Sequence, residues 1–149
     1  MIRLMTNAIK NLDLRAVSDS WSAKVDRLCE VAETLKDAQV EVPIEHHLHA
    51  GVYSRTILHK KGVICVGCSI HIPTQLIISG NVDIYTEGGV VHVEGYKVLD
   101  GEKGRRVVVY AHEDTWATML FSTNAMTVEE AEREFAGDSF EKLSNHRCM

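Results

Sequence analysis

Residues 75–111 read QLIISGNVDIYTEGGVVHVEGYKVLDGEKGRRVVVYA, and short apolar segments alternate with turn residues throughout this stretch. Dipeptides such as Gly80-Asn81 and Gly88-Gly89 are typical of tight connections between antiparallel strands. Nothing between the apolar segments is long enough for the crossover helix that a parallel sheet needs. The stretch therefore predicts consecutive strands of an antiparallel sheet.

The same pattern extends to both sides of this stretch. In all, eight segments are predicted to be strands: residues 52–59, 63–70, 75–79, 82–86, 90–94, 96–99, 105–111 and 115–121. Many short strands with tight connections favour a sandwich or a barrel, because closure limits the number of free sheet edges. We therefore expect a mainly β fold.

A helix is predicted on each side of the β-rich region. Residues 18–38 carry one apolar stripe with spacings of four and three, formed by Trp21, Val25, Leu28, Ala32 and Leu35. Such a stripe packs either on its own barrel or on the same helix of a second subunit. After the strands, Thr127 and Glu130 match a capping box, and Gly137 marks the end of a short C-terminal helix.

Size and charge narrow the class of protein. The chain has 149 residues, enough for one hydrophobic core, and we expect one folded unit with an N-terminal helical segment (1–42), a β-barrel (43–124) and a C-terminal helix and tail (125–149). The net charge is −5 without blocks of like charge, which argues against a broad nucleic-acid-binding surface. There is no apolar run long enough to span a membrane, and residues 1–10 lack the apolar core of a signal peptide. A cytoplasmic location is expected.

Cys65 and Cys68 form a C-x-x-C pair inside a predicted strand. Residues three apart on a strand point to opposite faces, so these two thiols are not expected to bind one metal ion. We expect them to be buried, reduced thiols.

Three segments of the chain resemble small cupin-like (jelly-roll) proteins encoded by tailed bacteriophages, a group without a settled biochemical function. The segments are Glu45-His46-His47-x-x-x-Gly51-Val52-Tyr53-x-Arg55, Ile70-His71 with Ile77-Ile78-Ser79-Gly80, and Tyr110-Ala111-His112-Glu113-Asp114-Thr115. The resemblance covers about residues 43–135. It implies a cupin-like jelly-roll barrel of about eight strands, and the cytoplasm of a bacterial host as its setting.

Cupins in general supply two or three histidines and a carboxylate to one metal ion from two short motifs. By this resemblance His71 falls near the histidine of the first motif, but Gln75 stands where relatives often carry a second one. Val107 stands at the expected histidine of the second motif, three residues past Gly104. These departures argue against a standard cupin metal site, whereas the resemblance in fold does not depend on them.

A different set of metal ligands is conceivable from the residues themselves. On an extended segment, Glu45, His47 and His49 share one face. Together with His71 they would give three imidazoles and a carboxylate, which suit a divalent transition metal. The alternative is that these histidines face solvent or form ordinary hydrogen bonds.

A second group of polar residues predicts ligand binding. Tyr53 and Arg55 share a strand face, and a guanidinium captures carboxylate or phosphate with two parallel hydrogen bonds. The predicted ligand-binding residues are Tyr53, Arg55, His71, Gln75, Arg106, His112 and Glu113. The alternative is that Arg55, Arg105 and Arg106 form ordinary salt bridges with acidic neighbours.

Three functions remain open at this point. The first is a cupin-like protein that holds a small polar or anionic ligand in its barrel. The second is a metal-dependent cupin-type enzyme, an isomerase, dioxygenase or lyase. The third is an oligomeric structural or virion-associated protein, assembled through the helix at residues 18–38 or through the barrel.

Overall fold

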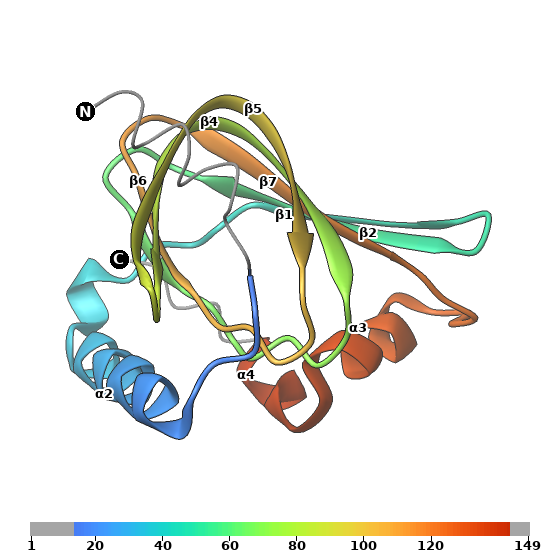
Figure 1. Ribbon diagram of the computed structural model, residues 1–149, viewed down its shortest axis with the longest axis horizontal. Helices are drawn as coiled ribbons and strands as arrows, with labels where there is room; N and C mark the ends of the chain where they lie inside the picture. The colour runs from blue at the N-terminus through green and yellow to red at the C-terminus, as the bar shows by residue number, and fades with distance from the viewer. Residues whose placement is uncertain (1–13, 144–149) are drawn as a thin grey trace.

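The computed structural model describes residues 14–143, in which seven antiparallel strands form one strongly curved sheet (Figure 1). The strands are β1 (Ile44–His49), β2 (Val52–His59), β3 (Ile64–Val66), β4 (Thr74–Thr86), β5 (Gly89–Gly101), β6 (Val108–Ala111) and β7 (Thr115–Ser122). Helix α2 (Asp19–Thr34) precedes the sheet, and helices α3 (Val128–Ala136) and α4 (Phe140–Leu143) follow it. The predicted fold class, a mainly β domain with one helical segment before the strands and a short one after them, is confirmed. The expectations for residues 1–10 lie outside the described residues.

Strand β4 joins the two halves of the sheet. Along one edge β4 pairs with β5 over its whole length. Along its other edge it pairs first with β7 and then with β6, which gives the strand order β1-β2-β7-β4-β6-β3. Because β4 passes from one partner to the next, the sheet curls and its inner face becomes enclosed (Figure 1).

The change of partner occurs at Gly80, which lies opposite Gly95 of β5. A Cβ atom at Gly80 would lie 2.7 Å from both Cα and Cβ of Thr115, which is closer than real side chains approach. The Thr115 hydroxyl accepts a hydrogen bond from the N–H of Asn81 (3.0 Å) and so fixes the neighbouring residue. The bend of β4 therefore depends on a residue without a side chain.

The sequence prediction was wrong about the role of two glycines. Turns were expected at Gly80-Asn81 and at Gly95, but both positions lie inside continuous strands of 13 residues each. A glycine inside a strand often marks a bend or a close approach of another backbone, and at Gly80 it marks both. The predicted strand at residues 63–70 shortens to β3, and the chain before Val52 forms the additional strand β1.

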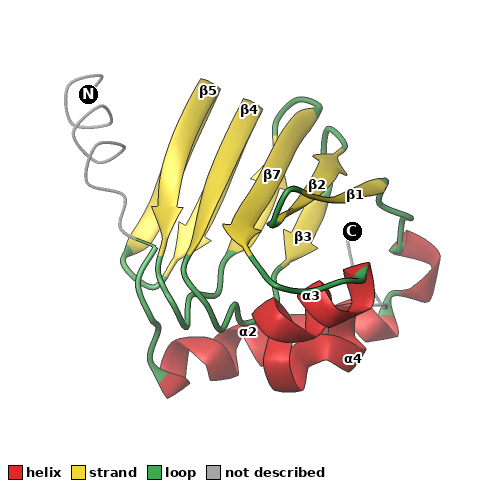
Figure 2. Ribbon diagram, turned by 90° about the vertical axis from the view of Figure 1, so that its right-hand side faces the viewer, coloured by secondary structure: helices red, strands yellow, loops and turns green. Residues whose placement is uncertain are grey.

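Helix α2 packs on its own sheet. The Ser18 hydroxyl caps it by accepting the Trp21 N–H (3.4 Å), and Val25 and Ala32 are buried. The Trp21 indole donates to the carbonyl of Arg106 (2.8 Å), which ties the helix to the segment before β6. The helices gather at one end of the strands (Figure 2), and none of the described helices has the length and apolar character to cross a membrane.

The C-terminal helix follows its predicted signals. The Thr127 hydroxyl accepts the N–H of Glu130 (3.1 Å), and α3 ends at Gly137 with φ of 50°. Phe135 is 1% exposed and stacks on Tyr53 with ring centroids 5.9 Å apart. Phe121 packs edge-on against Phe135. Helix α3 therefore covers one end of the enclosed face with an aromatic cluster.

Replacing Gly80 with alanine should destabilise the protein, because the new Cβ would overlap Thr115 at the bend of β4. We expect the free energy of unfolding to fall by about 1–3 kcal/mol, measured by chemical denaturation. Gly88→Ala is the matched control, since its Cβ would meet nothing closer than 3.8 Å. An equal loss in both variants would contradict the role assigned to Gly80.

Candidate functional site

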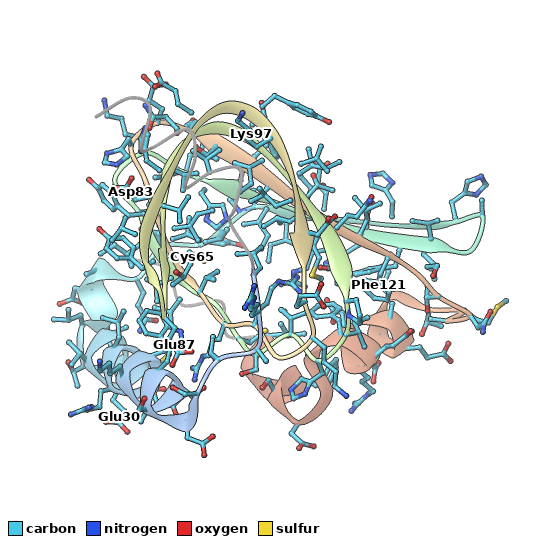
Figure 3. The ribbon with its side chains drawn as sticks, in the orientation of Figure 1. Glu30, Cys65, Asp83, Glu87, Lys97 and Phe121 are labelled. Atoms are coloured by element: carbon cyan, nitrogen blue, oxygen red, sulfur yellow. The ribbon has the colours of Figure 1, made fainter. Side chains whose placement is uncertain are left out.

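The curled sheet encloses a cavity of about 490 Å³. Apolar side chains from β2, β4, β6 and β7 form most of its wall, among them Ile57, Ile78, Val82, Ile84, Val109 and Met119. The side chains on α2 that line it are mainly acidic and exposed, namely Asp26, Glu30 and Glu33. The cavity therefore has an apolar interior and an acidic, exposed border. Cys65 lies inside the curl of the sheet and Asp83 outside it (Figure 3).

Three arginines line this cavity, and two of them are paired with carboxylates. Arg55 of β2 is 4% exposed and donates to Glu132 of α3 (2.9 Å). Arg106 is 6% exposed and donates to Asp26 of α2 (2.8 Å). Each pair connects the sheet to a helix, so these two side chains have an evident structural role.

Arg105 differs from the other two because all of its hydrogen-bond partners are neutral. Its side chain is 5% exposed and donates to the Thr74 hydroxyl (2.5 Å), with longer contacts to the carbonyls of Ile72 (3.5 Å) and Glu102 (3.4 Å). No carboxylate of the described residues forms an ion pair with it. Burial lowers the pKa of the guanidinium to about 10, so it remains a cation at neutral pH.

The guanidinium of Arg105 fills the space that a side chain at Gly101 would need. A Cβ atom at Gly101 would lie 2.6 Å from Cζ of Arg105. The chain around it is held by backbone hydrogen bonds, since Ile70 donates to the Arg105 carbonyl (3.0 Å) and Gly104 donates to Ile70 (2.7 Å). The backbone that carries this cation is therefore held in place, and the glycine at position 101 leaves room for the guanidinium.

His59 adds a second polar group to the cavity wall. It is 5% exposed, and its Nδ1 atom is buried without a hydrogen-bond partner among the described residues. A buried polar atom of this kind is costly unless something satisfies it. The apolar cavity thus has one histidine nitrogen without a hydrogen-bond partner among the described residues and one arginine with neutral hydrogen-bond partners.

The two cysteines of the C-x-x-C pair both line this cavity, together with Val66 and Gly67 between them. Strand β3 ends at Val66, and the chain leaves the regular strand before Cys68. Burial raises the pKa of the Cys68 thiol, so it stays protonated at neutral pH.

Of the seven predicted ligand-binding residues, Arg55 and Arg106 line the cavity. Tyr53 is fully buried against α3, and His71 donates its backbone N–H to Phe135 (2.8 Å) near the end of that helix. Gln75 and Glu113 are exposed, and His112 lies on the outer side of the sheet beside Asp83. The seven residues therefore do not form one site.

The predicted metal ligands are also not brought together. Glu45, His47 and His49 do share the exposed face of β1, whereas His71 lies in the loop before β4. Among the described residues, one group of three side chains places its ligand atoms within 4.8 Å of one another, and it consists of Asp83, His92 and His112. Glu45, His47, His49 and His71 do not meet this condition.

In that group the Asp83 carboxylate bridges two imidazoles. Its Oδ1 atom lies 2.7 Å from Nδ1 of His92, and its Oδ2 atom lies 2.8 Å from Nε2 of His112. Burial acts to raise the pKa of Asp83, but the hydrogen bonds from the two histidines outweigh it and hold this pKa below its usual value. The signal for this pair was present in the sequence, because a tight turn at Glu87-Gly88 places Asp83 opposite His92.

Comparison with solved structures found similarity to cupin proteins. A cupin superfamily protein from Desulfitobacterium hafniense DCB-2 is 10% identical, with a TM-score of 0.49 over 63% of this chain and 88% of that chain. A Cupin 2 conserved barrel domain protein from Salinispora arenicola CNS-205 is 16% identical, with a TM-score of 0.49 over 66% of this chain and 93% of that chain. Ectoine synthase from P. lautus is 13% identical, with a TM-score of 0.49 over 65% and 77% of the two chains. The sequence matches no family model and no curated protein.

Tyr53 should titrate far above an ordinary tyrosine. Burial raises its pKa from 10.0 to about 12, and its hydroxyl lies 2.9 Å from Nδ1 of His46. Because the folded pKa is the higher one, the stabilisation linked to this proton is complete below pH 10 and is lost as pH rises towards 12. An ultraviolet titration should show one of the four tyrosines ionising at about pH 12 or on unfolding, and Tyr53→Phe should remove that component. Loss of a component near pH 10 instead would contradict this assignment.

Proposed function

We propose that this protein binds a small organic anion, with a carboxylate or phosphate head and an apolar body, in the cavity of its curled sheet. The observation that carries the proposal is Arg105, a buried cation at the cavity wall whose hydrogen-bond partners among the described residues are all neutral, with the Glu102 carboxylate acting on it only through space. The surrounding wall is mostly apolar, and the volume of about 490 Å³ suits a small metabolite.

The energetics favour an anionic ligand. A charge that is removed from water is stabilised chiefly by an opposite charge with good hydrogen-bond geometry. Thr74 and two carbonyl oxygens supply hydrogen bonds to Arg105, but no negative charge. A ligand carboxylate or phosphate would supply that charge and accept two parallel N–H bonds from the planar guanidinium.

The remaining wall indicates what the rest of the ligand looks like. The apolar side chains of β4 and β7 offer no hydrogen bonds, so the body of the ligand would be apolar. His59 could satisfy its Nδ1 atom with one further polar group of the ligand. The paired arginines, Arg55 and Arg106, would raise the local positive potential while keeping their structural carboxylate partners.

A metal-dependent reaction inside the cavity fits these residues less well. His59 is the one histidine of its wall, and among the described residues no three metal-ligating side chains converge there. The cavity side chains therefore do not provide the ligand set that a cupin-type metal centre uses. We derive no catalytic step from them.

The biological setting is a further part of the proposal. We place the protein in the cytoplasm of a bacterial host, as a bacteriophage product and a homo-oligomer, on the basis of the sequence resemblance and of apolar side chains that α2 leaves exposed. These are Val31 of α2 and Leu35 at its C-cap, which are 54% and 47% exposed.

Arg105→Met should weaken anion binding without unfolding the protein. Benzoate and phenyl phosphate are suitable probes, and benzamide is the uncharged counterpart of benzoate. We expect at least one of the two anions to bind the wild-type protein in calorimetric titrations, benzamide to bind more weakly, and Arg105→Met to lose about tenfold or more in affinity for the anion. The free energy of unfolding should change by less than about 1 kcal/mol or increase, because a desolvated charge is replaced by an apolar side chain.

Arg133→Met is the matched control. Arg133 is exposed on α3, pairs with Glu129 and does not line the cavity, so its removal should leave anion affinity unchanged. Benzamide binding as tightly as the anion that binds best, equal losses in both variants, or no binding of either anion would each overturn the proposal.

A further inference from the structure

We propose that Asp83, His92 and His112 form a binding site for a transition-metal ion, such as Zn²⁺, on the outer face of the sheet. This site is separate from the cavity, because neighbouring residues of a strand point to opposite faces. Val82 and Ile84 line the cavity, so Asp83 between them points outwards, as Figure 3 shows. The inference therefore does not rest on the proposed function.

Three different segments supply the three side chains, and backbone pairing fixes each of them. Asp83 of β4 lies directly opposite His92 of β5 in the hairpin and opposite Tyr110 of β6 on its other side. His112 follows β6 directly, and its N–H donates to the carbonyl of Asn81 (2.9 Å). A site built on paired strands holds its ligand geometry without a flexible loop.

The distances suit a single ion. One ring nitrogen of His92, one ring nitrogen of His112 and a carboxylate oxygen of Asp83 all lie within 4.8 Å of one another. A zinc ion at about 2.0–2.2 Å from each atom needs ligand atoms no more than about 4.4 Å apart, so the three side chains would close around the ion from at most slightly beyond that spacing. The ion would take the place between the carboxylate and the imidazoles that two hydrogen bonds of 2.7 and 2.8 Å now occupy.

The ligand set indicates the class of ion. Two neutral imidazoles and one carboxylate suit zinc, cobalt, nickel or copper rather than magnesium or calcium, which prefer oxygen ligands. Three protein ligands leave at least one coordination position open to water. The side chains are 20%, 32% and 40% exposed for Asp83, His92 and His112, so an ion reaches them from solvent.

A neighbouring aromatic ring orients one of the ligands. The ring of Tyr110 packs edge-on against His112, with centroids 5.0 Å apart, and the two histidine rings lie 5.6 Å from each other. These contacts restrict the rotation of His112, so little side-chain freedom remains to be lost when an ion binds.

The competing explanation is a carboxylate that merely holds two histidines by hydrogen bonds. Zinc titration of the full-length protein, purified without a histidine tag and stripped with a chelator, separates the two. We expect one equivalent of Zn²⁺ to bind and to raise the melting temperature. His92→Ala, His112→Ala and the isosteric Asp83→Asn should each weaken that binding by about tenfold or more.

His47→Ala is the matched control, since His47 is exposed on β1 and outside the group. It should bind zinc as the wild type does. Circular dichroism of each variant without metal checks that the fold is kept, and Cu²⁺ spectra of the wild type should show nitrogen ligands that decrease in His92→Ala. Absence of stoichiometric zinc in the wild type, or wild-type affinity in Asp83→Asn and His92→Ala, would overturn the proposal.

Discussion

The path of β4 is the constraint on which the rest of the structure depends. Strand β4 pairs with β5 along one edge over its whole length. Along the other edge it pairs first with β7 and then with β6, and it bends at Gly80, where the partner changes. Strand alternation then sends Val82 and Ile84 inwards and Asp83 outwards. Three consecutive residues of one strand thus contribute to both features: Val82 and Ile84 to the apolar wall of the cavity, and Asp83 to the candidate metal site on the outer face.

Three arginines are buried to a similar extent, but their guanidinium groups have different partners. Arg55 and Arg106 connect the sheet to α3 and α2 through Glu132 and Asp26, so their charges stabilise the packing of the helices. Arg105, one residue before Arg106, is oriented differently and finds neutral acceptors. Burying a charge in this way costs stability, and such a cost is characteristic of a site that serves binding.

Local signals predicted much of the fold. The capping box at Thr127 predicted α3 nearly to the residue, and the apolar stripe after Ser18 predicted where α2 begins but not its end at Thr34, four residues before the expected one, because capping and amphipathic periodicity are local properties. The cavity could not be predicted, since it depends on which distant strands pair and which side of each faces inwards. Arg55 and Arg106 were selected for their residue type, whereas the distinction of Arg105 appears only when its neighbours are known.

The contact between Gly101 and Arg105 has a consequence for how the sequence can diverge. Any side chain at position 101 would occupy the space that the guanidinium fills. Substitution at either position therefore changes what the other can tolerate, and the two should covary across homologues. Glycine would be retained at 101 wherever arginine is kept at 105, and a lineage that has lost this arginine would be free to accept a larger residue there.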